Sequence, residues 1–177
     1  LPVPYTEEAA HYIAARIRQV QDLLGRRITV ENASYYCAPG QEISELDFIR
    51  TVLEEADCLM LLDINNVYVN SVNHAYDPVA FVRELPTARI AYAHIAGHTG
   101  AAPELIVDTH STPVIDPVWD LLDAAYAIHG VFPTMLERDE NIPPLANCLD
   151  EVRRIRAIQA AREHKDTTVL AAGAGGA

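Results

Sequence analysis

Long apolar runs, clustered basic residues and clustered cysteines are all missing from this sequence of 177 residues. No segment approaches the roughly 18 consecutive apolar residues that a membrane span requires. The chain also does not open with the basic and apolar segments of a signal peptide. We therefore expect a cytoplasmic protein that makes no contact with membranes.

Positive charge is scarce as well, because 13 Lys and Arg residues stand against 25 Asp and Glu residues, for a formal net charge of −12. Such a surplus repels phosphate backbones, and the basic residues are scattered, so we expect no nucleic-acid partner. The three cysteines, Cys37, Cys58 and Cys148, have the spacing of neither a disulfide framework nor a zinc ribbon. We interpret them as buried, unreactive thiols.

What is present is the composition of a folded domain, with half of the residues apolar and 21% charged. The first residue is not methionine, and we expect a chain that starts inside a longer domain.

Helical periodicity and capping residues predict helices over residues 6–24 and 44–56, from Asp77-Pro78 onward, from Asp116-Pro117 to Gly130, and from Pro143-Pro144 to about residue 164. Short apolar runs predict strands over residues 27–31, 58–62, 89–95 and 132–136, with a short extended piece at 105–107. Residues 65–77, rich in Asn and Tyr, are expected to form an excursion with a functional role, and residues 165–177 a flexible tail.

Strict alternation of helices and strands requires right-handed crossovers and a parallel sheet, which is an α/β fold. Four strands with helices outside fit either half of a TIM (β/α)8 barrel or a small open sheet. Polar residues cluster where the predicted strands end, and barrel enzymes keep their chemistry at that end. This clustering favours the barrel.

Four predicted strands end in a residue that can bind a metal ion: Glu31, Asp63, His94 and Glu137. Because the carboxyl ends of parallel strands emerge on one side of a sheet, these side chains are expected to converge. Asp108 and His110 stand two residues apart and would point the same way in an extended segment. Carboxylates combined with imidazoles suit iron, zinc or manganese. The joint pattern predicts a multinuclear metal site.

Each of these residues also has an ordinary structural interpretation. Taken singly, Asp63 would cap a helix, Glu137 would be a solvated charge, and His94 would be a core histidine. Three further residues remain open: Asn66 as a metal ligand or the end of a strand, His98 as a group behind the ligands or facing substrate, and Asp139 as a free base or an exposed charge.

Five segments together resemble the motifs of a known family. They are Glu31-Asn32-Ala33-Ser34, Asp63-Ile64-Asn65-Asn66-Val67-Tyr68-Val69, His94-Ile95-Ala96-Gly97-His98, Asp108-Thr109-His110, and Glu137-Arg138-Asp139-Glu140-Asn141-Ile142-Pro143. In this order they are similar to the multinuclear non-haem iron-dependent oxidative enzymes, the MbnB-like family. The resemblance covers nearly all of residues 1–164.

The resemblance implies a xylose-isomerase-like (β/α)8 barrel of which residues 1–164 form the C-terminal half, strands five to eight. It implies that Glu31, Asp63, His94, Asp108, His110 and Glu137 bind two or three iron ions, and that Asp139 is a candidate base. The N-terminal half, which brings further histidine ligands in such enzymes, is absent from the sequence. The implied reaction is oxidative modification of cysteine in a ribosomally made precursor peptide, delivered by a small partner protein. Tyr36, Tyr68 and Asn70 would be candidate peptide contacts.

Two other functions stay open at this stage. A hydrolase or sugar isomerase on the same barrel would use zinc or manganese to activate water, without electron transfer. A truncated barrel that keeps its motifs but no longer assembles the site would be a non-catalytic binding module.

Overall fold

The computed structural model describes residues 3–102 and 105–173. Its elements are, in chain order, α1 (Glu7–Leu24), β1 (Thr29–Glu31), α2 (Glu45–Ala56), β2 (Leu59–Asp63), α3 (Ile64–His74), α4 (Pro78–Arg83), the 3-10 turn η1 (Thr87–Arg89), β3 (Ile90–Ile95), β4 (Thr99–Ala102), β5 (Leu105–Val107), α5 (Asp116–His129), β6 (Thr134–Leu136) and α6 (Leu145–Gly173). None of the helices described has the length and apolar character needed to cross a membrane.

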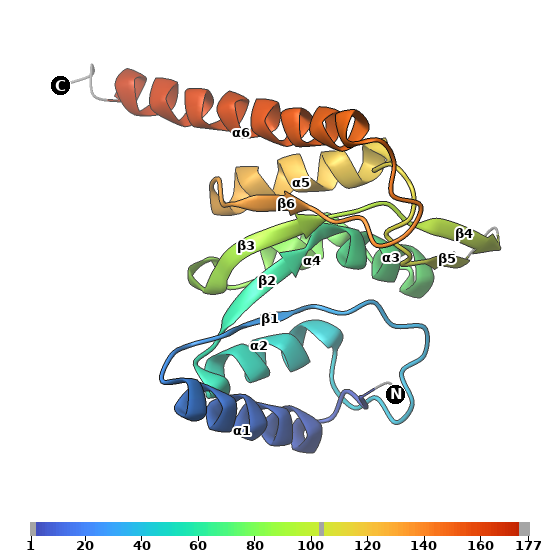
Figure 1. Ribbon diagram of the computed structural model, residues 1–177. Coiled ribbons are helices and arrows are strands. Elements are labelled where there is room, and N and C mark those ends of the chain that lie inside the picture. Colours follow the sequence, from blue (N-terminus) through green and yellow to red (C-terminus); the bar gives the residue numbers. More distant parts are fainter. Residues whose placement is uncertain (1–2, 103–104, 174–177) are drawn as a thin grey trace.

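The main sheet has the order β1-β2-β3-β6, and every pair in it is parallel. The predicted α/β class with a parallel sheet is therefore confirmed. The strands run with their carboxyl ends toward the side of the molecule where the β4–β5 hairpin and the loop after β1 lie (Figure 1). All side chains that follow these strands are consequently delivered to one edge of the sheet.

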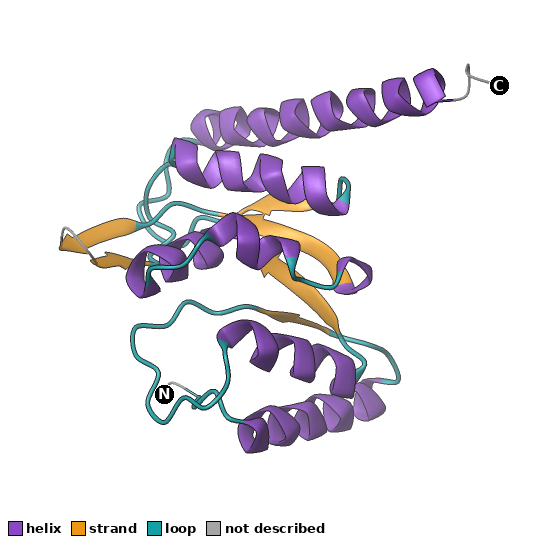
Figure 2. Ribbon diagram, turned by 180° about the vertical axis from the view of Figure 1, so that it is seen from behind, coloured by secondary structure: helices purple, strands orange, loops and turns teal. Residues whose placement is uncertain are grey.

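Helices α3 and α4 lie behind the sheet in Figure 1 and in front of it when the molecule is turned round in Figure 2. Helices α1 and α2 pack on each other beside β1, and α5 and α6 lie beside β6. The core forms where these helices meet the sheet, and the central strand β2 is the most deeply buried, with Leu62 fully enclosed. Burial on both faces explains why β2 reads as an unbroken apolar run.

Local capping accounts for where the first helices begin. The hydroxyl of Thr6 accepts a hydrogen bond from the backbone N–H of Ala9 at the start of α1, and Gly25 ends the helix in a left-handed conformation. Ser44 caps α2 in the same way through Asp47 N–H. Both helices begin and end within one residue of the predicted limits.

The predicted extended piece at 105–107 is confirmed as β5, which pairs with β4 in a hairpin. Three expectations from the sequence need correction. Residues 65–77 do not form an excursion, because Asp63 caps α3 and most of the segment belongs to this helix, with Asn65, Asn66 and Asn70 buried. Asp116 is the first residue of α5 and not its cap, which is Ile115. Among the cysteines, Cys58 is buried, but Cys37 is exposed.

Helix α6 continues to Gly173, beyond the predicted helix end near residue 164. The remaining residues of the predicted tail, 174–177, lie outside the described residues.

Candidate metal centre

Four ligand-type side chains meet at the carboxyl edge of the sheet. Glu31 ends β1, Asp63 ends β2, His94 lies one residue before the end of β3, and Glu137 directly follows β6. One donor atom from each of these side chains lies within 4.8 Å of the others. His94 Nδ1 is 2.8 Å from Glu137 Oε2 and 3.9 Å from Glu31 Oε1. The register of the sheet, which pairs Asp63 with His94, brings these side chains to the same level.

A second group shares Glu137 with the first. His110 Nδ1 lies 3.3 Å from Glu137 Oε2 and 3.2 Å from Asp139 Oδ2, and these three residues again bring their donor atoms within 4.8 Å of one another. The other ring nitrogen, His110 Nε2, is 2.6 Å from Asp108 Oδ1. His110 has a φ of +47°, a left-handed conformation that turns the chain so that its ring faces the end of β6.

Buried atoms without hydrogen-bond partners test whether this centre suits a metal ion. Over residues 3–102 and 105–173, only six such side-chain atoms are found, and five belong to predicted ligands: Asp63 Oδ2, Asn66 Oδ1, His94 Nδ1, His110 Nε2 and Glu137 Oε2. His94 Nδ1 and Glu137 Oε2, for example, lie 2.8 Å apart, but their relative orientation is not that of a hydrogen bond. Buried polar atoms in proteins almost always form hydrogen bonds. Five neighbouring residues with buried atoms that form none are therefore consistent with a bound cation.

Electrostatics support the same interpretation. Burial raises the pKa of Asp63 well above its ordinary value. Burial, followed by the nearby Glu137 charge, raises the pKa of Glu31. The adjacent Asp108 carboxylate raises the pKa of His110 to about 9. Crowded carboxylates that resist ionisation become good ligands when a cation supplies the missing positive charge.

Asparagines hold the first group in place. Asn32 donates from Nδ2 to Asp63 O at 3.0 Å and accepts from Asp63 N at 2.9 Å, so its amide pairs with the backbone of the neighbouring strand. Asn66 donates from its backbone to Asp63 Oδ1 at 2.6 Å and from Nδ2 to Asn32 O at 2.9 Å. These bonds leave Asp63 Oδ2 and Asn66 Oδ1 as the free acceptors. Asn66 thus has the environment expected of an amide ligand.

Asp108 is held by three neighbours. Its Oδ2 accepts from Ser34 Oγ at 3.0 Å, its Oδ1 accepts from Asn65 Nδ2 at 2.7 Å, and its backbone N–H donates to Tyr36 OH at 3.0 Å. The carbonyl oxygen of Asn65 in turn lies 2.8 Å from His98 Nδ1. This chain of contacts links His98 to Asp108 through the side chain of Asn65.

Sequence reasoning did not identify Asn32, Ser34 and Asn65 as members of this centre. All three adjoin a predicted ligand in the chain or lie within three residues of one, which was the available signal. Tyr68 contacts the ring of His98 at 5.3 Å, while Asn70 is fully buried and bonds Tyr35, Ala33 and Glu45. Burial removes Asn70 from the candidate peptide contacts.

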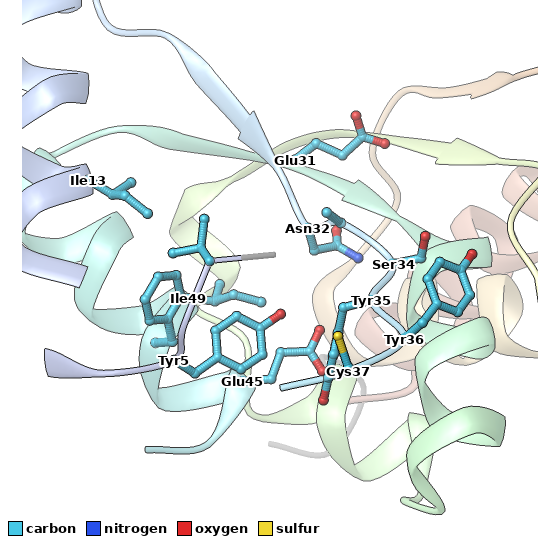
Figure 3. Close-up of a pocket in the computed structure, with 13 residues that line it drawn as sticks. Tyr5, Ile13, Glu31, Asn32, Ser34, Tyr35, Tyr36, Cys37, Glu45 and Ile49 are labelled. Atoms are coloured by element: carbon cyan, nitrogen blue, oxygen red, sulfur yellow. The ribbon is translucent and has the colours of Figure 1, made fainter. Parts of the chain in front are cut away.

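The centre is open on one side. The side chain of Glu31 is 40% exposed and that of Asp139 is 61% exposed, in contrast to the buried Asp63. A cavity of about 480 Å³ adjoins Glu31 and runs between α1, α2 and residues 31–37 (Figure 3). Its walls carry Tyr5, Tyr35 and the exposed Cys37, and Glu45 lies at its side. Glu31 therefore belongs both to the candidate metal centre and to the lining of this cavity.

Comparison with known proteins places the chain in a family. Residues 1–160 match the family model described as RiPP precursor modification enzyme MbnB/TglH/ChrH. A UPF0276 protein of Nitrosospira multiformis is 60% identical over 168 residues, 94% of this chain and 59% of the relative. A UPF0276 protein of Shewanella amazonensis is 55% identical, covering 91% of this chain and 58% of the relative.

A UPF0276 protein of Pseudomonas aeruginosa is 51% identical, covering 90% of this chain and 56% of the relative. The chain therefore spans less than two thirds of the length of these relatives. The match over residues 1–160 makes the chain a member of the MbnB/TglH/ChrH family of RiPP precursor modification enzymes.

Proposed function

We propose that the protein uses a multinuclear iron centre to modify cysteine residues oxidatively in a ribosomally made precursor peptide. The observation that carries this proposal is that five buried donor atoms without a hydrogen bond belong to residues at or near the carboxyl edge of the sheet, in a chain of this family. The donor set of carboxylates, imidazoles and one amide suits iron, and zinc or manganese are the alternatives.

The proposed ligands form two groups, each of which would bind one ion. Glu31, Asp63, Asn66, His94 and Glu137 would hold one ion, and His110 Nδ1, Glu137 and Asp139 would hold a second. Asp108 would be a further ligand on the Nε2 side of His110. Bound iron supplies one-electron chemistry with dioxygen and a Lewis acid for a thiolate. Asp139 would offer Oδ2, which faces His110, to the ion, and its other oxygen is a candidate acceptor for the proton of the substrate thiol because the side chain is exposed to solvent.

The peptide would lie in the cavity beside Glu31. Its walls offer aromatic rings and backbone groups of residues 32–37, which can bind an extended peptide while its cysteine reaches the metal centre. A small partner protein that delivers the peptide belongs to the same proposal.

We further propose that the four parallel strands are strands five to eight of a (β/α)8 barrel. Three features support this: Glu31, Asp63, His94 and Glu137 lie at the carboxyl ends of the four strands, helices lie behind the sheet, and β1 and β6 have no neighbour on their outer sides within the described residues.

The test is to load the purified protein with Fe(II) under anaerobic conditions, add a Cys-containing precursor peptide, admit oxygen, and measure the mass of the peptide. We expect an oxidative mass change that depends on iron. Asp63→Asn should abolish it because it removes a buried ligand. Asp57→Asn makes the same chemical change at an exposed carboxylate paired with Arg27 and should leave activity intact.

Activity with zinc or manganese and no oxygen requirement would instead support a hydrolase or isomerase. Stoichiometric metal binding without any change in peptide or other substrate would support a non-catalytic module.

A further inference from the structure

The side chains of residues 137–139, directly after β6, point alternately to two sides of the chain. Extended chain alternates its side chains, so Glu137 and Asp139 lie on one side and Arg138 on the other. The two carboxylates approach His110 Nδ1 at 3.3 and 3.2 Å. Arg138 Nη2 instead reaches helix α6, where it donates to Glu151 Oε2 at 2.7 Å. The residue between the two acidic groups is thus anchored to a helix behind them.

The second oxygen of the same carboxylate binds another part of the centre. Glu151 Oε1 accepts from the backbone N–H of Val114 at 2.8 Å, four residues after His110. The backbone N–H of Asp139 donates to His110 O at 3.0 Å. One half-buried carboxylate on α6 therefore connects the chain after β6 with the chain that carries His110.

Burial makes this pair different from most ion pairs of the protein. The side chain of Arg138 is 6% exposed and that of Glu151 16%, whereas Arg154 and Asp116 form a pair with 47% and 81% of their side chains exposed. Arg138 Nε has no hydrogen-bond partner among the residues that the structure describes. A buried guanidinium depends strongly on its remaining partner, so the side chain has little freedom to leave Glu151.

We propose that the Arg138–Glu151 pair is a positioning device for the metal position formed by His110, Glu137 and Asp139. It anchors the chain after β6 on α6 and so sets the spacing of the two carboxylates relative to the imidazole. The proposal rests on the proposed function in one respect, namely that this group binds an ion. It adds that the Arg138–Glu151 pair, although neither residue is a proposed ligand, determines how many ions the centre binds.

The experiment compares Fe(II) binding by purified wild-type protein, Arg138→Met and Glu151→Gln under anaerobic conditions, with metal counted by elemental analysis and affinities measured by calorimetric titration. Arg138→Met removes the charge but keeps an unbranched side chain. Glu151→Gln keeps an acceptor for Val114 and loses the charge. We expect the last ion to bind about 10- to 100-fold more weakly, with the first ion unaffected. Arg138→Lys, which keeps the charge, should recover part of the loss.

Arg162→Met is the matched control. Arg162 also projects from α6 and pairs with Asp123 of α5, a carboxylate outside both metal groups. It should bind the wild-type number of ions with wild-type affinity, even if its thermal stability falls as much as that of Arg138→Met.

The outcomes separate the two proposals. Wild-type protein that binds no iron contradicts the proposed function and this inference together. Wild-type protein that binds several ions while Arg138→Met and Glu151→Gln bind the same number equally tightly contradicts the inference alone. An equal loss of affinity in Arg162→Met also contradicts it, because the effect would then be general destabilisation. If Arg138→Met does not fold, the result with Glu151→Gln decides.

Discussion

Asn65 determines how the side chains of Asp108, a proposed ligand, and of His98 are oriented. An ionised Asp108 only accepts hydrogen bonds, so the NH2 group of Asn65 must face it and the amide oxygen must face His98. The ring of His98 then carries its proton on Nδ1. Burial lowers the pKa of His98, which favours this neutral form. One fully buried amide thus fixes both a carboxylate and a tautomer.

Replacing Asn65 by leucine should weaken metal binding. Leucine is similar in size but can neither donate to Asp108 nor accept from His98, so we expect a loss of affinity of about 10- to 100-fold, measured by calorimetric titration with Fe(II). Gln159→Leu removes an amide that bonds Tyr126 and the backbone of Phe132, and it should leave affinity unchanged. Equal affinity of Asn65→Leu and wild type would refute a role for this amide.

Glu45 is a buried carboxyl outside both metal groups. Burial raises its pKa to about 7, although hydrogen bonds from Asn70 and Tyr76 lower it in part. The unfolded chain releases this proton near pH 4.5, and the folded chain keeps it to about pH 7. The folded state therefore binds more protons in this window, so its stability falls as the pH rises through it.

Glu45→Gln should remove this dependence. Between about pH 4.5 and pH 8, we expect the free energy of unfolding of the wild type to fall by up to about 3 kcal/mol relative to the variant, measured by urea denaturation. Comparison with the variant at each pH cancels the contribution of the other titrating groups. Parallel pH profiles for the two proteins would contradict a raised pKa at Glu45.

At the scale of elements, the segments after β3 and after β5 are pressed together at Gly97. A Cβ atom on Gly97 would lie 2.1 Å from Thr112 O and 2.6 Å from Pro113 O, both rigid backbone atoms. Thr112 Oγ1 also donates to His98 O at 2.9 Å. The close approach keeps the chain that carries His110 beside the chain that carries His94.

Gly97→Ala should push these segments apart. We expect a loss of about 1 to 3 kcal/mol in stability, seen as a lower melting temperature, and weaker Fe(II) binding. Gly100→Ala is the control, because a Cβ atom on Gly100 would meet nothing within 4 Å and the change should be close to neutral. A melting temperature for Gly97→Ala equal to that of the control would show that the segments can separate freely.

Elements with a strong local signal were predictable from the sequence, and elements that depend on distant contacts were not. Thr6, Ser44 and Gly25 mark their helices through bonds within a few residues. Helix α3 was missed because its cap, Asp63, was interpreted as a strand end and ligand, and because its buried asparagines look like loop residues. Those asparagines are tolerated inside because each bonds a segment more than 20 residues away.

The same division applies to the centre. The convergence of Glu31, Asp63, His94 and Glu137 follows from parallel strands and could be predicted. The partners Ser34 and Asn65 could not, since their bonds to Asp108 join residues 74 and 43 positions apart. Glu151 lies on a helix whose relation to the centre emerges only when the chain is folded.

At the scale of the whole molecule, metal binding and stability should be coupled. Acidic side chains crowd together at the strand ends only in the folded chain, so a bound cation stabilises the folded state and not the unfolded one. With Fe(II) at about 100 times its dissociation constant, we expect a gain of about 3 kcal/mol. A chelator should then lower the melting temperature by roughly 5 to 10 °C, measured by scanning calorimetry.

Asp63→Asn provides the control for this measurement, because the loss of a ligand should make the melting temperature nearly independent of the chelator. A chelator effect of the same size in Asp63→Asn and wild type would place the stabilising ion elsewhere.

The amide of Asn32 has a consequence for the choice of ion. By giving and accepting one hydrogen bond with the main chain of Asp63, it acts as an additional peptide unit at the point where the backbone ladder between β1 and β2 stops. The hydrogen bonds of Asn32 hold the two strands together for one residue beyond the end of the ladder. The main chain after Glu31 can nevertheless turn away from β2. Ions of different radius cannot then be accommodated by spreading these strands. Adjustment falls instead to the long, solvent-accessible side chain of Glu31, which can swing without disturbing the sheet.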